Sequence, residues 1–312
     1  MFRLKIVPQK TNIPFIGMRN ITFAISGLLT LASIVLYFTA GLNYGIDFRG
    51  GTMIEIGTEA ATDVGRVRTI VSGLGLGDVQ AQTFGGDNAV LIRLEQSAGG
   101  EQEQQKAVAD VKAALDKEYG APVTYRRIEL VGPKVSGDLV NAGVLAVVLA
   151  VGAMLIYVWF RFEWQFGVGS VIALVHDVAM TIGIFSLLQL EFNLAIVAAI
   201  LTIVGYSMND TVVVYDRVRE NLRKFRKMPL DELLNLAINE TLSRTTMTSF
   251  TTLVALSVLF IFGGEVIRGF TFAMIWGIFI GTYSSIFIAA PFLLLVGIKR
   301  DWSEVKMASA NN

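Results

Sequence analysis

Six stretches of this chain are apolar over about 20 residues or more, which is long enough to cross roughly 30 Å of hydrocarbon as a helix. They are residues 20–42, 139–160, 166–188, 192–215, 242–262 and 269–298. A chain with this pattern can adopt few folds, because backbone polar groups inside a bilayer must pair within helices or a closed barrel. The sequence therefore predicts a polytopic α-helical membrane protein.

The composition supports this class. Of the 312 residues 53% are hydrophobic, and acidic and basic residues balance at a formal net charge of zero. The absence of cysteine excludes a disulfide framework and a thiol nucleophile, and one histidine cannot form a histidine cluster. No GxxxxGK[ST] phosphate loop occurs, which excludes ATP use by that route. We expect no enzymatic activity, no metal and no cofactor.

Lysine and arginine are concentrated in alternate connecting segments. Positive charge marks the cytoplasmic side of a membrane protein. The rule predicts a cytoplasmic N-terminus over residues 1–19, a cytoplasmic tail over 299–312 and a basic cytoplasmic loop over 216–241. Within this loop, 229–239 has the pattern of an amphipathic helix, which we expect to lie along the inner membrane surface or to pack on the bundle.

Residues 43–138 are polar and must then be extracytoplasmic, or periplasmic. Periodicity predicts strands at 52–56, 78–84, 89–95 and 123–131 and helices at 62–72 and 101–119. This order is the split βαβ unit of a ferredoxin-like α+β domain. The domain is either a compact module without a pocket or a docking surface for an outer partner.

A carboxylate lies inside the fourth apolar run. Placing a charge such as Asp210 within a span costs about 2.5–3.5 kcal/mol on insertion scales, so it indicates a functional site. Ser207 and Thr211 share its helical face, and Asn209 precedes it. These residues form a candidate proton-coupling site.

Arg244 is the candidate partner of this carboxylate. Asp210 and Arg244 lie equally far inward from predicted outer helix ends at 192 and 262, about 27 Å at roughly 1.5 Å per residue. The alternative for Arg244 is an anchor that extends its charge to the inner surface. Hydroxyl groups that follow it, such as Thr248, line a hydrated route or bond back to the preceding turn.

Secondary candidates lie elsewhere in the spans. His176 and Asp177 in the third run suggest a proton path, although His176 can also be a neutral residue bonded to a neighbouring helix. Asp216 and Arg217 follow the fourth run. In the sixth run, the GxxxG spacing at 277–281 permits close helix approach.

Several motifs together identify a family. In order, they are GIDFRGG at 45–51, the pair His176 and Asp177, GYSMNDT at 205–211, DRVREN at 216–221, SRT at 243–245 and GTYSS at 281–285. With this order and spacing on six spans, the chain resembles the SecF branch of the SecD/SecF family of bacterial protein-export membrane proteins.

The resemblance implies a function and partners. SecF-like proteins pair with SecD in a twelve-span assembly of the resistance-nodulation-division (RND) superfamily. They act beside the SecYEG translocon with its SecA ATPase, often with YajC, in the bacterial cytoplasmic (inner) membrane. The pair is thought to use the proton-motive force to draw unfolded preprotein outward. Asp210 would be the proton-responsive carboxylate and Arg244 its coupled partner. Lipid is an expected contact and nucleic acid is not.

The resemblance also covers the segment after the first span. Gly45, Asp47, Phe48, Gly50 and Gly51 form the motif that leads into the outer domain. The two consecutive glycines fit either a flexible connection or a tight turn.

Two other classes of function remain open. A small-molecule or lipid exporter of the same superfamily would share the carboxylate but would need a substrate cleft in a larger outer domain. A scaffold subunit of the translocon would tolerate neutralisation of Asp210.

Overall fold

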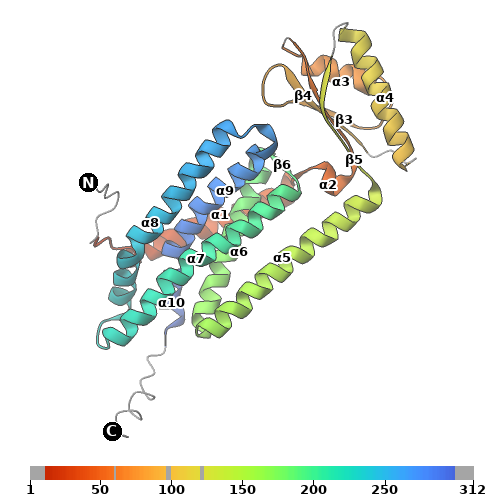
Figure 1. Ribbon diagram of the computed structural model, residues 1–312. Helices are drawn as coiled ribbons and strands as arrows, with labels where there is room; N and C mark the ends of the chain where they lie inside the picture. The colour runs from red at the N-terminus through yellow and green to blue at the C-terminus, as the bar shows by residue number, and fades with distance from the viewer. Residues whose placement is uncertain (1–10, 60, 96–99, 120–122, 299–312) are drawn as a thin grey trace.

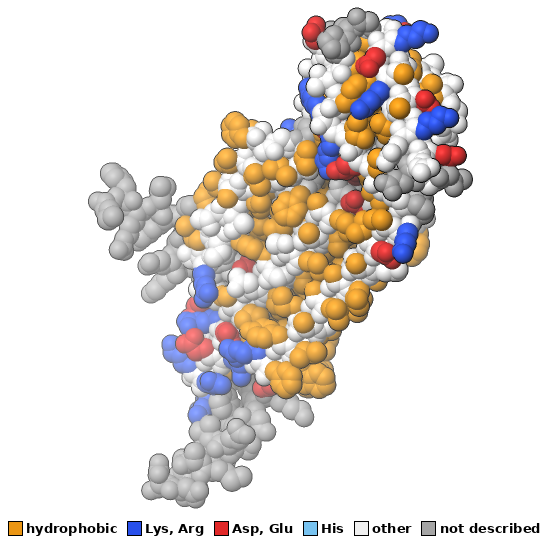
Figure 2. Space-filling model, turned by 45° about the vertical axis from the view of Figure 1, so that its right-hand side comes forward, with side chains coloured by type: hydrophobic (Ala, Val, Ile, Leu, Met, Phe, Trp, Pro, Cys, Tyr) orange, Lys and Arg blue, Asp and Glu red, His pale blue; other side chains and the backbone are white. Residues whose placement is uncertain are grey.

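A computed structural model describes residues 11–59, 61–95, 100–119 and 123–298, and it comprises a helical bundle with a small α+β domain at one end (Figure 1). Six helices are long and apolar enough to cross a membrane, which confirms the predicted class. Hydrophobic side chains cover the middle of the bundle, whereas charged ones gather at its far end and on the small domain (Figure 2). This distribution matches a membrane-embedded bundle.

The membrane helices agree with the predicted runs, with differences at their ends. They are α1 (Arg19–Thr39), α5 (Pro133–Arg161), α6 (Trp164–Leu188), α7 (Leu194–Lys224), α8 (Leu230–Phe262) and α9 (Glu265–Ser284), followed by a π-helical turn (Ser285–Ala289) and α10 (Ala290–Val296). A 3₁₀ turn (Ile16–Met18) precedes α1. The first helix ends three residues before the predicted boundary at 42. The predicted tail at 299–312 lies outside the described residues.

The amphipathic helix predicted at 229–239 is present as the first part of α8 (Leu230–Phe262), and of its two predicted positions the structure has the one packed on the bundle. Proline precedes α8 at its start, and the helix then continues without a break through the fifth span. Its first apolar face is buried within the bundle, through Leu233, Leu234, Ala237 and Ile238. The Asn239 side chain accepts from the backbone N–H of Ile13 at 2.9 Å and donates to its carbonyl at 3.0 Å. The N-terminal segment and the bundle core thus cover this face, which does not lie on the membrane surface.

Two glycines allow α7 and α9 to pack closely. A Cβ atom at Gly277 would lie 2.2 Å from Ile203 Cδ1, and one at Gly281 would lie 2.9 Å from Ser207 Cβ. No side chain fits at such distances, so the GxxxG spacing serves helix contact as predicted. The contact places the middle of α9 directly against the face of α7 that carries Ser207.

The small domain has the predicted ferredoxin-like topology. Its elements are β2 (Gly51–Gly57), α3 (Val64–Ser72), β3 (Val79–Thr83), β4 (Ala89–Leu94), α4 (Gly100–Tyr119) and β5 (Thr124–Val131). The antiparallel sheet has the order β3-β4-β2-β5. Fully buried Ile54, Ile92, Val67 and Val111 form the centre of the core between the sheet and the two helices.

A short connection ties this domain to the bundle. After α1, the strand β1 (Asn43–Tyr44) pairs in parallel with β6 (Glu191–Phe192), which lies between α6 and α7. The short helix α2 (Ile46–Arg49) then leads into β2. The start of the outer domain is therefore fixed to the outer end of α7.

Candidate functional site: buried carboxylates in the bundle

Asp210 is buried in the middle of α7, with 1% of its surface exposed. Among the described residues its Oδ2 has no hydrogen-bond partner. The polar side chains that interact with the carboxylate are the Thr282 hydroxyl of α9, the Ser249 hydroxyl of α8 and, by charge alone, Arg244 of α8. The Thr282 and Ser249 hydroxyls are themselves 2.7 Å apart. The burial of Asp210 within a membrane helix agrees with the sequence, and its proton-coupling role stays a prediction.

Arg244 lies near this carboxylate but does not contact it. Its side chain is exposed, and in the described part of the chain no ion pair within 4.0 Å joins it to Asp210. Its influence is electrostatic only. The structure therefore brings the predicted partners into the same region without forming the predicted pair.

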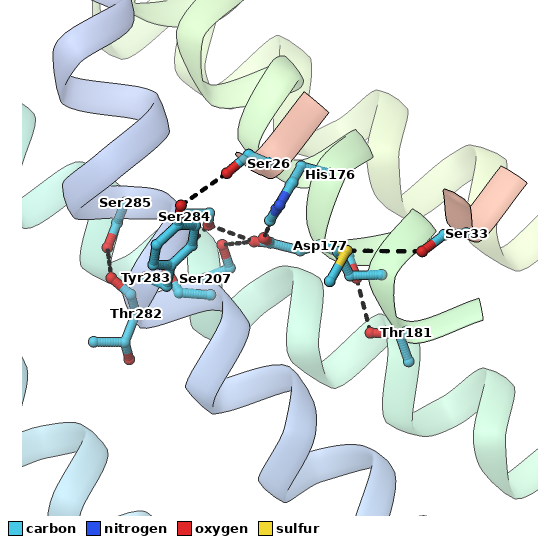
Figure 3. A network of polar contacts seen from close by, with 12 residues as sticks. Ser26, Ser33, His176, Asp177, Thr181, Ser207, Thr282, Tyr283, Ser284 and Ser285 are labelled. Atoms are coloured by element: carbon cyan, nitrogen blue, oxygen red, sulfur yellow. Dashed lines mark hydrogen bonds and ion pairs between the residues drawn. The ribbon is translucent and has the colours of Figure 1, made fainter. Parts of the chain in front are cut away.

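A second carboxylate, Asp177 of α6, is the centre of a hydrogen-bond network (Figure 3). It is fully buried, and its Oδ2 accepts from Ser207 Oγ at 2.6 Å and from Ser284 Oγ at 2.8 Å. His176 Nδ1 lies 3.0 Å from Oδ1. The polar contact of the histidine is thus with its sequence neighbour, while its ring lies beside the Tyr283 ring of α9. Through the Asp177 carboxylate, the network joins α6, α7 and α9.

The polar residues predicted around Asp210 on α7 lie in different surroundings. Ser207 is bonded to Asp177 rather than to Asp210. Thr211 is buried, whereas Asn209 is exposed and points away from the carboxylate that follows it. A period of 3.6 residues identified a shared helical face but not the partner of each side chain.

Asp216 and Arg217 lie outside the site, at the charged end of α7. Asp216 forms an ion pair with Arg161 at 2.6 Å. Arg217 pairs with Glu220 at 2.6 Å and with Glu240 of α8 at 2.7 Å. These contacts hold the inner ends of α5, α7 and α8 together.

The hydroxyl groups of α8 and α9 have different roles. Thr248 Oγ1 bonds back to the carbonyls of Arg244 and Thr245, at 3.2 and 2.9 Å, as in the predicted alternative of helix back-bonding. Sequence reasoning assigned no role to Thr282 or Ser284, which contact the two carboxylates. Their signal is a hydroxyl-rich GTYSS motif inside an apolar helix. Within the described ranges, no three His, Asp or Glu side chains gather as metal ligands.

The glycine-rich motif makes specific contacts at the outer end of the bundle. Asp47 Oδ2 accepts from the backbone N–H of Leu194 at 2.9 Å, and the N–H of Gly45 donates to the Phe192 carbonyl at 2.8 Å. The Phe48 ring packs against the rings of Tyr44 and Phe192.

Positive φ values of 71° at Gly50 and 113° at Gly51 turn the chain into β2. This geometry corresponds to the tight-turn alternative.

Comparison with known families decides what this arrangement belongs to. The family model described as protein export membrane protein SecD/SecF, C-terminal, matches residues 111–299. The SecD/SecF GG motif matches residues 37–62, which include the glycine-rich connection. The chain belongs to the SecD/SecF family of protein-export membrane proteins. It is accordingly a membrane-embedded accessory subunit of Sec-dependent protein translocation, as the sequence motifs predicted.

Individual SecD/SecF relatives agree over nearly the whole chain. Protein translocase subunit SecF of Cereibacter sphaeroides is 48% identical over 305 residues, covering 96% of this chain and 94% of that protein. The subunit of Rickettsia felis is 43% identical over 295 residues, covering 95% of each chain. The crystal structure of SecDF, a translocon-associated membrane protein from Thermus, superimposes with a TM-score of 0.83 at 36% identity. The match covers 95% of this chain but only 40% of the SecDF chain.

Proposed function

We propose that this chain uses the proton-motive force, together with SecD, to promote late, SecA-independent steps of preprotein translocation across the bacterial cytoplasmic membrane. The observation that carries the proposal is the buried Oδ2 of Asp210, without a hydrogen-bond partner in the described structure. This oxygen can accept a proton without losing a hydrogen bond. A charge that crosses the membrane potential releases about 2.3 kcal/mol per 100 mV, which is comparable to the gap between two conformations.

The surroundings of Asp210 support two states of the bundle. When the carboxylate is charged, the Thr282 and Ser249 hydroxyls and the positive Arg244 stabilise it. Protonation removes the charge and with it the attraction to Arg244. In this proposal, Arg244 approaches and leaves the carboxylate during the cycle, and α7 and α8 repack accordingly. Because α7 begins at the contact with Asp47, its movement reaches the outer domain.

The proposed partners are SecD, the SecYEG translocon with SecA, YajC and unfolded preprotein. The length relationship supports SecD, because the solved SecDF chain is much longer than the part that this chain matches. Basic residues at the inner end of α7, such as Arg217, Arg219 and Arg223, support cytoplasmic termini. The exposed apolar side chains of α5 support contact with lipid or a partner helix.

Preprotein translocation into inverted membrane vesicles tests the proposal. The wild-type chain and Asp210→Asn are each produced with SecD at equal membrane levels, and translocation is measured with and without an imposed proton gradient. Asp210→Asn should lose the gradient-dependent component while SecA-driven translocation continues. The control is Ser170→Ala, which removes a buried hydroxyl on α6 that bonds to the Phe166 carbonyl of its own helix. Full gradient-dependent export by Asp210→Asn would instead support the scaffold alternative.

A further inference from the structure

The two buried carboxylates of the bundle have opposite hydrogen-bond states. The Oδ2 of Asp177 accepts from the Ser207 and Ser284 hydroxyls, and His176 Nδ1 lies 3.0 Å from Oδ1. Asp210 has a buried Oδ2 without a hydrogen-bond partner among the described residues. Asp177 thus connects α6 to two neighbouring helices, whereas one oxygen of Asp210 is left without a donor. The two residues are therefore suited to different tasks.

Helices α7 and α9 link the two carboxylates: α7 carries Asp210 and contacts Asp177, and α9 contacts both. On α7, Ser207 lies one turn before Asp210. On α9, Thr282 faces Asp210 and Ser284 binds Asp177. Gly281 lies so close to Ser207 that a Cβ added at Gly281 would be 3.3 Å from Ser207 Cα. A rotation or slide of either helix thus changes the contacts of both carboxylates together.

We infer that Asp177 is a positioning residue, a buried carboxylate on α6 that holds α7 and α9 through Ser207 and Ser284 and thereby places Asp210 beside Thr282. This inference rests on the proposed function and specifies how its site is held. Among the described ionisable groups, His176 on the same helix lies 3.0 Å from Asp177, and the Tyr283 ring of α9 lies 6.1 Å from the histidine ring between centroids. The ionisable group on α7 is Asp210, and Arg244 of α8 acts electrostatically on Asp210. From α1, the Ser26 hydroxyl lies 2.9 Å from Tyr283 Oη.

The helix becomes irregular directly after Ser284. The π-helical turn (Ser285–Ala289) begins at the next residue, and π-turns occur often at functional sites. Ser284 Oγ also lies 3.1 Å from the Gly281 carbonyl, so it has a second acceptor when it leaves Asp177. The Asp177 contact therefore selects one of two arrangements of the serine at the start of an irregular turn.

Three variants and one control test the positioning role. Ser207→Ala and Ser284→Ala each remove one donor, and Asp177→Asn removes the charge. The control, Thr181→Val, removes a buried hydroxyl on α6 that bonds only to the backbone carbonyl of Asp177. Each is produced with SecD, and gradient-dependent translocation into inverted vesicles is measured at several pH values.

The pH midpoint of gradient-dependent translocation separates positioning from structural support. Ser207→Ala and Ser284→Ala should shift this midpoint by about half a pH unit or more, because Asp210 then meets different neighbours. Thr181→Val should keep the wild-type midpoint. Asp177→Asn should reduce the gradient-dependent component of translocation about tenfold or more. An unchanged midpoint in both serine variants would overturn the inference, even if their translocation activity falls. A loss of stability alone lowers the amount of translocation without moving its pH midpoint.

The outcomes for Asp210 and Asp177 remain distinguishable. If Asp210→Asn loses gradient dependence while both serine variants keep the wild-type midpoint, the proposed function holds and the positioning role fails. If Asp210→Asn retains full gradient dependence, the proposed function itself fails. Because Asp177→Asn can fail to assemble, its membrane level is measured first, and the serine variants decide the question if that level is low.

Discussion

Asp47 Oδ2 accepts a hydrogen bond from the backbone N–H of Leu194 at 2.9 Å, and this bond joins the glycine-rich connection to the first residue of α7. The first N–H groups of a helix have no partner within the helix, and the N-terminal end attracts negative charge. Asn193, the N-cap, satisfies a second such group, the N–H of Ile196. The helix that carries Asp210 therefore starts at a contact with the outer domain's connecting segment.

Removal of the Asp47 carboxylate from the start of α7 should destabilise this helix. Asp47→Ala should lower the free energy of unfolding by about 1 kcal/mol, because it loses both the acceptor and the charge. Asp47→Asn keeps an acceptor and loses the charge, which costs about 0.3–1 kcal/mol. Thermal unfolding of the full chain in detergent measures both. Equal stability of Asp47→Ala and the wild type would show that the contact adds nothing.

Arg93 and Glu191 should be energetically coupled across the junction of the two parts. Arg93 on β4 forms an ion pair with Glu191 of β6 and lies 3.3 Å from Asn43 Oδ1. Both side chains are largely buried, so a double-mutant cycle of alanine variants should give a coupling of about 0.5–3 kcal/mol. The exposed pair Arg66 and Glu118 within the outer domain is the control, for which we expect no measurable coupling. Equal results for the two pairs would contradict the prediction.

Methyl groups at the α7–α9 contact should be poorly tolerated. Gly277→Ala and Gly281→Ala place a Cβ within 2.2 and 2.9 Å of existing side-chain atoms, so each should cost about 1–3 kcal/mol of stability. Gly152→Ala on α5 meets no atom within 4 Å and should be neutral or slightly stabilising. Unfolding in detergent compares the three. If all behave alike, the close approach does not limit packing.

The outer domain should lose stability at high pH through Tyr125. Burial and the hydrogen bond to Asp116, at 2.9 Å, raise the pKa of Tyr125 above its usual range. The unfolded chain releases this proton near pH 10, before the folded chain does, so the contribution is complete below about pH 10 and is lost above it. Hydrogen exchange of β5 and α4 in the wild type and Tyr125→Phe measures this. The stability difference between them should shrink above about pH 10. A constant difference would exclude the effect.

The sequence alone determined the six spans, the strand and helix order of the outer domain and the location of Asp210 inside a span. These features are local, because hydropathy over about 20 residues, periodicity and the cost of a charge in hydrocarbon need no knowledge of neighbours. The motif around Asp47 was likewise visible as a pattern of residues, although its contact with Leu194 was not.

Only the tertiary structure decided which polar groups meet. Ser207 shares a helical face with Asp210 but bonds Asp177, Arg244 remains apart from Asp210, and Ser284 supplies a donor that the sequence did not indicate. The start of α8 packs on the bundle rather than on the membrane surface. The physical reason is that rotation and axial offset of packed helices determine these contacts. Both depend on close approaches such as Gly281 to Ser207, which hydropathy does not encode.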